Sequence, residues 1–508
     1  MTISGVSGRT SYIGSGILDL RSQLDTLTQQ LSSGKVSSTY AGQGSGRSLA
    51  ITLRSQITAM AGYADTAVNL NTRIGIANLS LQRLVDIGST VKGAAVSAGT
   101  TLDNTGQTAG QKTATLSFVD SVDMLNTKSG DRYLFSGRAT DTAPVASSSE
   151  IMDGDGIKDG LKTVIAQRKV ADLGTGTGRL TIAPQVAGST AVSIAEDASP
   201  SVFGMKLTNV SSTLTGATVT GPTGTPAAIS VDLGATNPNP GDKVKFTFTM
   251  PDNTLETIEM TAVAAGTSPM PDNSFELGAT SDATATNLNA ALTTSVGNLA
   301  RGPMVAASAI AAGNNFFDSP PTRVGTGGAS ATTLVDGSAN TVSWYKGEAN
   351  TTANGSARGS AVAQVDQSIT VQYGARADES ALRSQLQTVA VFAAFSIDVT
   401  NIANPNVAKD ANAQVAALNQ RVAQNLAPVA GTQSIQDIQA DFAGASVSIK
   451  AATDRQTQTK ALSQTLLDSI EGINDDEVAT KILALQTALQ ASYQATSKLY
   501  QMSLVKFL

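Results

Sequence analysis

Residues 13–31 read IGSGILDLRSQLDTLTQQL, and their apolar side chains recur at alternating intervals of four and three. This spacing places the apolar residues on one narrow face of an α-helix, which is typical of a helix that packs against a partner helix. We therefore predict that the segment is one half of a coiled coil. The members of this N-terminal stripe are Ile13, Ile17, Leu20, Leu24, Leu27 and Leu31.

The other end of the chain, residues 471–508, repeats the pattern. Its stripe begins at Val478, includes Thr496, and ends in a run of apolar residues. Chain ends are normally polar and frayed, so a weakly charged apolar end suggests burial against another copy of the molecule. The expected assembly interface is therefore the N-terminal stripe together with Ile482, Leu485, Leu489, Tyr493, Tyr500, Leu504, Phe507 and Leu508.

A second helical pattern follows a Gly-rich break at residues 39–46 and runs over residues 48–98. A helix of this length spans roughly 75 Å at 1.5 Å per residue. It is too long for one compact globule, so we expect it in an elongated bundle or coiled coil. A third helix is predicted over residues 111–129, after a break at residues 104–110.

Helical periodicity returns after Ala377. One apolar stripe covers residues 382–402 and is ended by Asn404-Pro405, and another long helix is predicted over residues 435–466. Asn474-Asp475-Asp476 is expected to provide the N-cap of the terminal helix. Because helices occupy both ends of the chain, we expect the two terminal segments to pair with each other.

The middle of the chain, from about residue 140 to residue 359, has a different character. Gly-, Pro- and Thr-rich turns separate short alternating runs, and the clearest is a β-hairpin over residues 244–262. We also predict a short helix at residues 288–299 and strands at residues 342–345 and 369–373. The insert is expected to have a hydrophobic core of its own and to contribute little to the helices. That core includes Val244, Phe246, Phe248, Ile258 and Met260.

The predicted fold class is mainly α with a β insert. The N- and C-terminal helices would pair in an elongated coiled-coil bundle, and one or more β-rich outer domains would be inserted in the middle. At 508 residues the chain is long enough for several domains, and 41% apolar content supplies their cores.

Composition argues against an enzyme. The chain has no Cys and no His, which removes thiol nucleophiles, imidazole acid–base catalysis, disulfides and the usual zinc ligands. We expect no catalytic residues, no cofactor and no metal. A net charge of −6 gives no basic surface for nucleic acid. We see no secretory signal and no apolar run of about 18 residues, so we expect no membrane insertion and either a cytosolic protein or export without a cleaved signal.

Two short motifs are better explained as turns than as binding sites. Gly174-Thr-Gly176-Thr-Gly178 lacks the Gly-Lys-Ser/Thr ending of a phosphate loop, so it is predicted to be a turn. Asp153, Asp155 and Asp159 loosely resemble calcium ligands, but the loop has no bidentate acid at its twelfth position. Neither motif is assigned a ligand.

Three segments resemble the bacterial flagellin family, which includes the filament flagellins and the hook–filament junction protein (hook-associated protein 3). Residues 27–35 (LTQQLSSGK) resemble its N-terminal signature, and residues 131–144 (DRYLFSGRATDTAP) resemble the segment before its outer domain. Residues 492–508 (SYQATSKLYQMSLVKFL) are similar to the C-terminus of the junction protein. These motifs are specific for the superfamily, and they leave open which member the chain is.

The resemblance implies three layers. Residues 1–46 and 470–508 would form an inner coiled-coil layer, residues 47–140 and 362–469 a helical rod, and residues 141–361 the outer surface domain. One departure concerns the turn after the N-terminal signature, where the family usually has an acidic doublet and residues 36–47 carry no acid. The long insert favours a filament flagellin, whereas the ending SLVKFL favours the junction protein.

The family also implies a function. Its members are structural proteins of the extracellular bacterial flagellum, which serves motility, and type III export carries them unfolded through the flagellar channel without a cleaved signal peptide. The partners would be copies of the chain, other axial proteins (hook-associated proteins and flagellin) and an export chaperone. The terminal segments would order on joining neighbours, because short unpaired coiled-coil helices are marginal in water. A surface adhesin with a helical stalk is the alternative, and it would need a signal peptide or membrane anchor.

Overall fold

The computed structural model describes residues 4–97, 99–198, 200–349 and 351–505. Helices account for 54% of it, and several small sheets make the fold a mixture of α and β. The chain divides into two compact units. The terminal unit comprises Met1–Thr72, Ala363–Val371 and Ala445–Leu508, and the central unit comprises Arg73–Val362 and Gln372–Gly444. The boundaries of these two units differ from those of the three layers expected from the sequence, and the layers stay a prediction.

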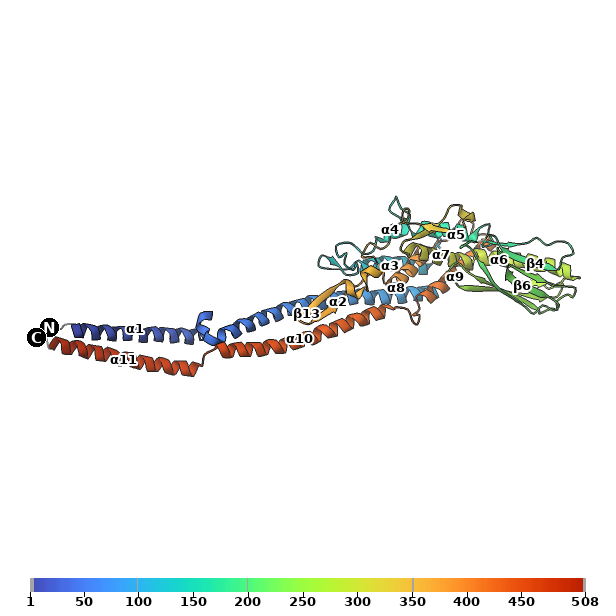
Figure 1. The fold of residues 1–508 in the computed structure, drawn as a ribbon. Coiled ribbons are helices and arrows are strands. Elements are labelled where there is room, and N and C mark those ends of the chain that lie inside the picture. Colours follow the sequence, from blue (N-terminus) through green and yellow to red (C-terminus); the bar gives the residue numbers. More distant parts are fainter. Residues whose placement is uncertain (1–3, 98, 199, 350, 506–508) are drawn as a thin grey trace. The chain divides into compact units, whose positions relative to one another are not determined.

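Long helices dominate the terminal unit (Figure 1). The first helix ends at Ser33, before Gly34, whose positive φ of 68° takes the chain out of the helix. Asn474 caps the last helix as expected, because its side-chain oxygen accepts the backbone N–H groups of Asp476 and Glu477. The elements that contribute to this unit are α1 (Ser4–Ser33), η1 (Tyr40–Gly46), α2 (Arg47–Ser97), α10 (Ile435–Glu471) and α11 (Asp475–Val505).

A short antiparallel hairpin also contributes to the terminal unit. It consists of β13 (Val362–Asp366) and β14 (Ile369–Gln372), the second of which covers most of the strand predicted at residues 369–373. Side chains of α10 hold the hairpin: Arg455 forms an ion pair with Asp366, and the buried amide of Gln456 donates to the carbonyl of Val365. These contacts fix the hairpin against the helix.

Two four-stranded sheets form the β part of the central unit. Their strand orders are β3-β4-β7-β6 and β10-β9-β8-β5. The first contains β3 (Leu180–Ile182), β4 (Ala191–Glu196), β6 (Thr218–Thr223) and β7 (Ala228–Asp232). The second contains β5 (Lys206–Ser212), β8 (Lys243–Thr249), β9 (Leu255–Val263) and β10 (Ser274–Glu276). Shorter pairs are β1 (Lys128–Ser129) with β2 (Arg132–Tyr133), and β11 (Thr322–Val324) with β12 (Leu334–Asp336).

The predicted hairpin is confirmed. Strands β8 and β9 pair antiparallel with Phe246 opposite Ile258 and Val244 opposite Met260. All five residues predicted for the core of the insert are at most 3% exposed, in one cluster that also includes residues of α6. Alternation therefore identified the buried face correctly, because successive side chains of a strand point to opposite faces of the sheet.

Helices complete the central unit, and sequence periodicity missed several of them. The short helix expected at residues 288–299 is part of α6, but α5, α7 and α9 were not predicted. The α7 sequence MVAASAIAAGNNFF is buried on nearly all sides, so it has no amphipathic stripe to detect. The helices here are α3 (Ala109–Leu125), α4 (Ser148–Asp153), α5 (Leu161–Leu173), α6 (Ser281–Arg301), α7 (Pro303–Phe317), α8 (Ser380–Ala394) and α9 (Pro405–Asn425), with η2 (Gly328–Ser330), η3 (Thr352–Asn354) and η4 (Arg358–Ser360).

Three expected elements were wrong in detail. The third helix ends at Leu125, because residues 128–129 belong to β1. Among residues 342–345 only Tyr345 makes an isolated bridge, with Val145. Trp344 is buried in a loop, where its indole N–H donates to the Phe317 carbonyl at 3.1 Å. The stripe over residues 382–402 is helical only to Ala394.

Phe395 explains why that helix stops early. Its backbone is extended (φ −71°, ψ 127°), and its carbonyl accepts the side-chain amide of Gln111 at 2.7 Å. Two residues later, the N–H of Ile397 donates to the carbonyl of Gly106 at 3.0 Å. The backbone groups thus find partners at the start of α3 instead of in a continued helix.

The expectation that the insert contributes little to the flanking helices is wrong. Helix α7 lies against both α8 and α9. Its Gly313 is close enough to α8 that a Cβ there would meet Val391 at 2.4 Å. In addition, Arg421 of α9 forms a 2.7 Å ion pair with Asp252, in the turn between β8 and β9, and both side chains are at most 5% exposed. The insert and these helices therefore share one packed structure.

This ion pair gives a test of the shared structure. Replacing Arg421 by Gln leaves Asp252 as a buried charge without its partner, so the free energy of unfolding should fall by about 3 to 5 kcal/mol. A double-mutant cycle with Asp252→Asn should show coupling between the two sites. Urea denaturation followed by the fluorescence of Trp344, the only tryptophan, reports on the central unit.

The matched control is Lys243→Gln. It removes the half-exposed ion pair that Lys243 of β8 forms with Glu259 of β9. It should cost less than about 1 kcal/mol. A loss for Arg421→Gln no larger than this control would show that the hairpin is not tied energetically to α9.

Candidate assembly surface

The two terminal helices lie side by side in the terminal unit (Figure 1). Backbone hydrogen bonds join the segment after α1 to the segment before α11. Val36 N–H donates to the Glu471 carbonyl at 2.8 Å, and Ile473 N–H donates to the Gly34 carbonyl at 3.3 Å. Since the end of one helix meets the start of the other, α1 and α11 run antiparallel.

The residues predicted for the assembly interface differ in how deeply this pairing buries them. Five of the N-terminal stripe (Ile13 to Leu27), with Ile482 and Leu485, are half-buried, and Leu489 is buried. Leu31, Tyr493 and Tyr500 are exposed, at 41%, 52% and 63%. The side chain of Leu504, and Phe507 and Leu508 altogether, lie outside the described residues. The interface itself stays a prediction, but most of its described members face the seam between α1 and α11.

Other large apolar side chains of these helices remain in solvent. Leu18 and Leu483 are 68% and 64% exposed, and Tyr12 and Leu499 are also exposed. Leu18 and Leu483 each follow a stripe residue by one position, which turns them about 100° away from the seam. Sequence reasoning missed these positions because it selected only the four-three stripe. Together with Leu31, Tyr493 and Tyr500, they define what we call the flanking surface.

One carboxylate connects the segments at which the helices of the terminal unit are interrupted. Glu471, the last residue of α10, is 5% exposed. Its side chain accepts hydrogen bonds from Arg54 at 2.5 Å and from Gln43 at 3.0 Å, and lies 3.7 Å from the ammonium group of Lys35. These partners come from three segments: the turn after α1, the helix η1, and the start of α2. We call this cluster the Glu471 joint.

The joint supplies the acid that the turn after α1 lacks. Residues 36–47 carry no acidic residue, and the carboxylate that meets them comes from a position more than four hundred residues later. Glycine makes the close approach feasible, because a Cβ on Gly46 would meet Ile470 at 2.7 Å. The hydrogen bond from Arg54 holds the pKa of Glu471 below its usual value, although burial opposes the shift.

Neither of the two motifs interpreted as turns brings its side chains together at one site. All three glycines at 174, 176 and 178 have positive φ in a turn, as predicted. The aspartates of the other motif have separate partners: Asp153 pairs with Lys162, Asp155 accepts backbone N–H groups, and Asp159 pairs with Arg323. Their carboxylates therefore do not converge on one point.

The Glu471 joint predicts a pH dependence of stability. Because its pKa is lower in the folded chain, Glu471 stabilises the fold above its ordinary pKa of about 4.3 and loses this contribution as the pH falls through the folded value. At pH 7, Glu471→Gln should lower the free energy of unfolding of the terminal unit by about 1 to 3 kcal/mol. The difference from the unchanged chain should shrink in acid.

Thermal melting followed by far-ultraviolet circular dichroism between pH 7 and pH 3 measures this difference. Glu477→Gln is the control, because Glu477 forms an ion pair with Lys481 but is well exposed on α11, so its loss should cost under about 1 kcal/mol. A destabilisation by Glu471→Gln that does not change with pH would contradict the assigned role of the carboxylate.

Comparison with known proteins identifies no family and no curated relative for the chain, because it matches no protein-family model and no curated protein. Within the described residues, no helix has the length and apolar character needed to span a bilayer.

Proposed function

We propose that this chain is a non-catalytic structural subunit of the extracellular bacterial flagellum, and that it polymerises through its terminal helices. It would act either as a filament flagellin or as the hook–filament junction protein. The observation that carries the proposal is the pair of matching apolar stripes at the two ends of the chain, which lie against each other in α1 and α11. The three sequence segments that resemble the flagellin family support it.

The geometry suggests different roles for the half-buried members of the stripe and for the flanking surface, which includes the exposed stripe residues Leu31, Tyr493 and Tyr500. The stripe closes the seam within one chain, because most of its described members are half-buried there. The flanking surface is then free to contact neighbouring subunits. Burial of that surface would drive polymerisation at roughly 25 cal/mol per Å² of apolar area removed from water. In this arrangement the paired terminal helices form a coiled coil at the inside of the assembly, and the insert lies on its outer surface.

The proposal includes the route and the partners. The subunit would be exported unfolded by type III export, without a cleaved signal peptide, with an export chaperone to hold it before passage. Outside the cell it would contact copies of itself and other axial proteins. A filament flagellin adds identical subunits without limit, whereas a junction protein stops after joining two different partners, so the length of the assembly distinguishes the two members.

Charge substitutions on α1 and α11 test the two surfaces separately. Leu18→Asp with Leu483→Asp should block assembly while leaving the helical signal unchanged, because both side chains are already in solvent in the single chain. Leu24→Asp should block assembly and also loosen the seam, since a charge placed there is desolvated at a cost of several kcal/mol. Electron microscopy scores assembly, and circular dichroism scores folding.

The matched control is Gln23→Asp, which adds the same charge at an exposed position of α1. It should assemble normally. If the double variant of the flanking surface formed ordinary filaments or junctions, these helices would not be the polymerisation surface, and the proposed function would fail.

A second prediction concerns the single chain before assembly. Within residues 1–46 and 470–508, the described parts of α1 and α11 pair through one half-buried seam, so these terminal segments should open far more often than the central unit. Limited proteolysis of the monomer should trim both ends and leave a resistant core, whereas the assembled form should keep them. Resistance of both ends in a chain shown to be monomeric by sedimentation would contradict this expectation.

A further inference from the structure

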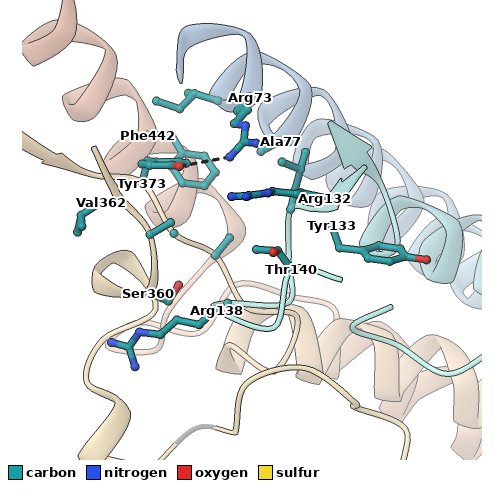
Figure 2. Close-up of a pocket in the computed structure, with 16 residues that line it drawn as sticks. Arg73, Ala77, Arg132, Tyr133, Arg138, Thr140, Ser360, Val362, Tyr373 and Phe442 are labelled. Atoms are coloured by element: carbon teal, nitrogen blue, oxygen red, sulfur yellow. Dashed lines mark hydrogen bonds between the residues drawn. The ribbon is translucent and has the colours of Figure 1, made fainter. Parts of the chain in front are cut away.

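A cavity of about 360 Å³ opens in the central unit, and every residue that lines it belongs to that unit. Its walls come from α2, from β2 and the loop that follows it, from both sides of the β13–β14 hairpin, and from Phe442 of α10 (Figure 2). The volume lies at the small end of the range of known ligand sites, about 300 to 1,000 Å³. It therefore has room for a small molecule.

Arginines dominate the polar part of the lining. Arg73, Arg132 and Arg138 all line the cavity, and no acidic residue is among the described residues that do so. Arg138 is already neutralised, because its guanidinium lies 2.8 Å from the carboxylate of Glu348 and its backbone N–H donates to the same group. The other two arginines decide the charge of the cavity.

Neither Arg73 nor Arg132 forms an ion pair within the described part of the chain. Arg73 donates one long hydrogen bond of 3.4 Å to the neutral hydroxyl of Tyr373. In Figure 2 the side chains of Arg73 and Arg132 extend into the same opening, beside Tyr373. Two like charges at one cavity repel each other, and an anion between them would remove that repulsion.

The surroundings suit an oxyanion. Guanidinium groups present a planar fork of N–H donors that matches the oxygens of a phosphate or carboxylate. Apolar side chains form part of the lining, among them Ile74, Ala77 and Phe442, which are at most 4% exposed. Arg73 is half-buried and Arg132 is exposed. The apolar walls therefore reduce the solvent mainly near Arg73, and they strengthen its attraction for a bound anion.

Backbone hydrogen bonds hold the walls in place before any ligand arrives. Gly137 N–H donates to the carbonyl of Ala375 at 3.1 Å, and Tyr373 N–H to that of Ala361 at 2.9 Å. Gly374 packs so closely that a Cβ there would meet the carbonyl of Ala357 at 2.5 Å. A site formed in advance loses less entropy when it binds its ligand.

We propose that this cavity binds an oxyanion, namely the phosphate or carboxylate group of a small molecule, through Arg73 and Arg132. The same chemistry could be supplied by an acidic side chain of a second copy of the chain. The inference is independent of the proposed function, because it rests on the central unit alone.

Inorganic phosphate is the probe for the test. Isothermal titration of the full chain at constant ionic strength should show saturable binding, and Arg73→Gln with Arg132→Gln should weaken it at least about tenfold, since each removes a charge-assisted contact. Arg83→Gln is the matched control: it removes the same charge from α2 about 15 Å further along the helix, and it should change binding less than about twofold. Trp344 fluorescence verifies that each variant is folded.

The second arm separates the two sources of the anion. Sedimentation of the chain with and without phosphate shows whether the arginines hold a carboxylate of another copy. Self-association that is lost in the double variant and displaced by phosphate would support the site with a second copy as its ligand. The proposal is overturned if phosphate does not bind and self-association is unchanged in the double variant, or if Arg83→Gln weakens phosphate binding as much as the double variant does.

Discussion

The terminal unit depends on one constraint: two breaks in the helices, one near each end of the chain, must be joined. The helices α1 and α2 are interrupted by Gly34 and η1, and α10 and α11 are interrupted after Glu471. Each break leaves backbone groups that a continuous helix would have satisfied, and some of them pair across the two breaks, as Val36 N–H does with the Glu471 carbonyl. The carboxylate of Glu471 joins the side chains at the same place, because it contacts Arg54, Gln43 and Lys35 at once.

The Glu471 joint and the seam between α1 and α11 should respond differently to substitutions. The seam between α1 and α11 is a sum of half-buried apolar contacts, and each contributes a little. The joint depends on a single charge that is nearly out of water, so removing one partner leaves the others unsatisfied. Loss of a stripe residue should therefore weaken the pairing gradually, whereas loss of Glu471 should release the turn after α1.

Much of the helical part of the fold could be predicted, because amphipathic helices carry their period in the sequence. The start of the last helix at Asn474 was also predictable, since an N-cap is formed by residues that are close in the sequence. What failed depends on tertiary contacts. Helix α7 is apolar on nearly every side, and the helix predicted beyond Ala394 stops because Phe395 finds its hydrogen-bond partner at Gln111, nearly three hundred residues earlier.

The same distinction applies to the two candidate sites. Both stripes of the assembly surface were visible in the sequence, and their pairing was expected. The flanking surface around Leu18 and Leu483 was not, because its exposure depends on how α1 and α11 pack together. For the arginine cavity the sequence held no signal at all. Arg73 and Arg132 lie fifty-nine positions apart, and although Arg132 belongs to the segment 131–144, no motif connects it with Arg73, so their shared cavity arises from folding alone.

The insert changes how the whole chain should be understood. An outer domain that merely decorates a helical scaffold would have no buried charge connecting the two. Here Arg421 and Asp252 form such a connection, and α7 fills the space against α8 and α9. These contacts are of the kind found inside a single folded domain, where the loss of either side exposes the other. Variation in the middle of the chain should therefore be tolerated at the exposed loops of its sheets, and resisted at α7 and at the turn that contains Asp252.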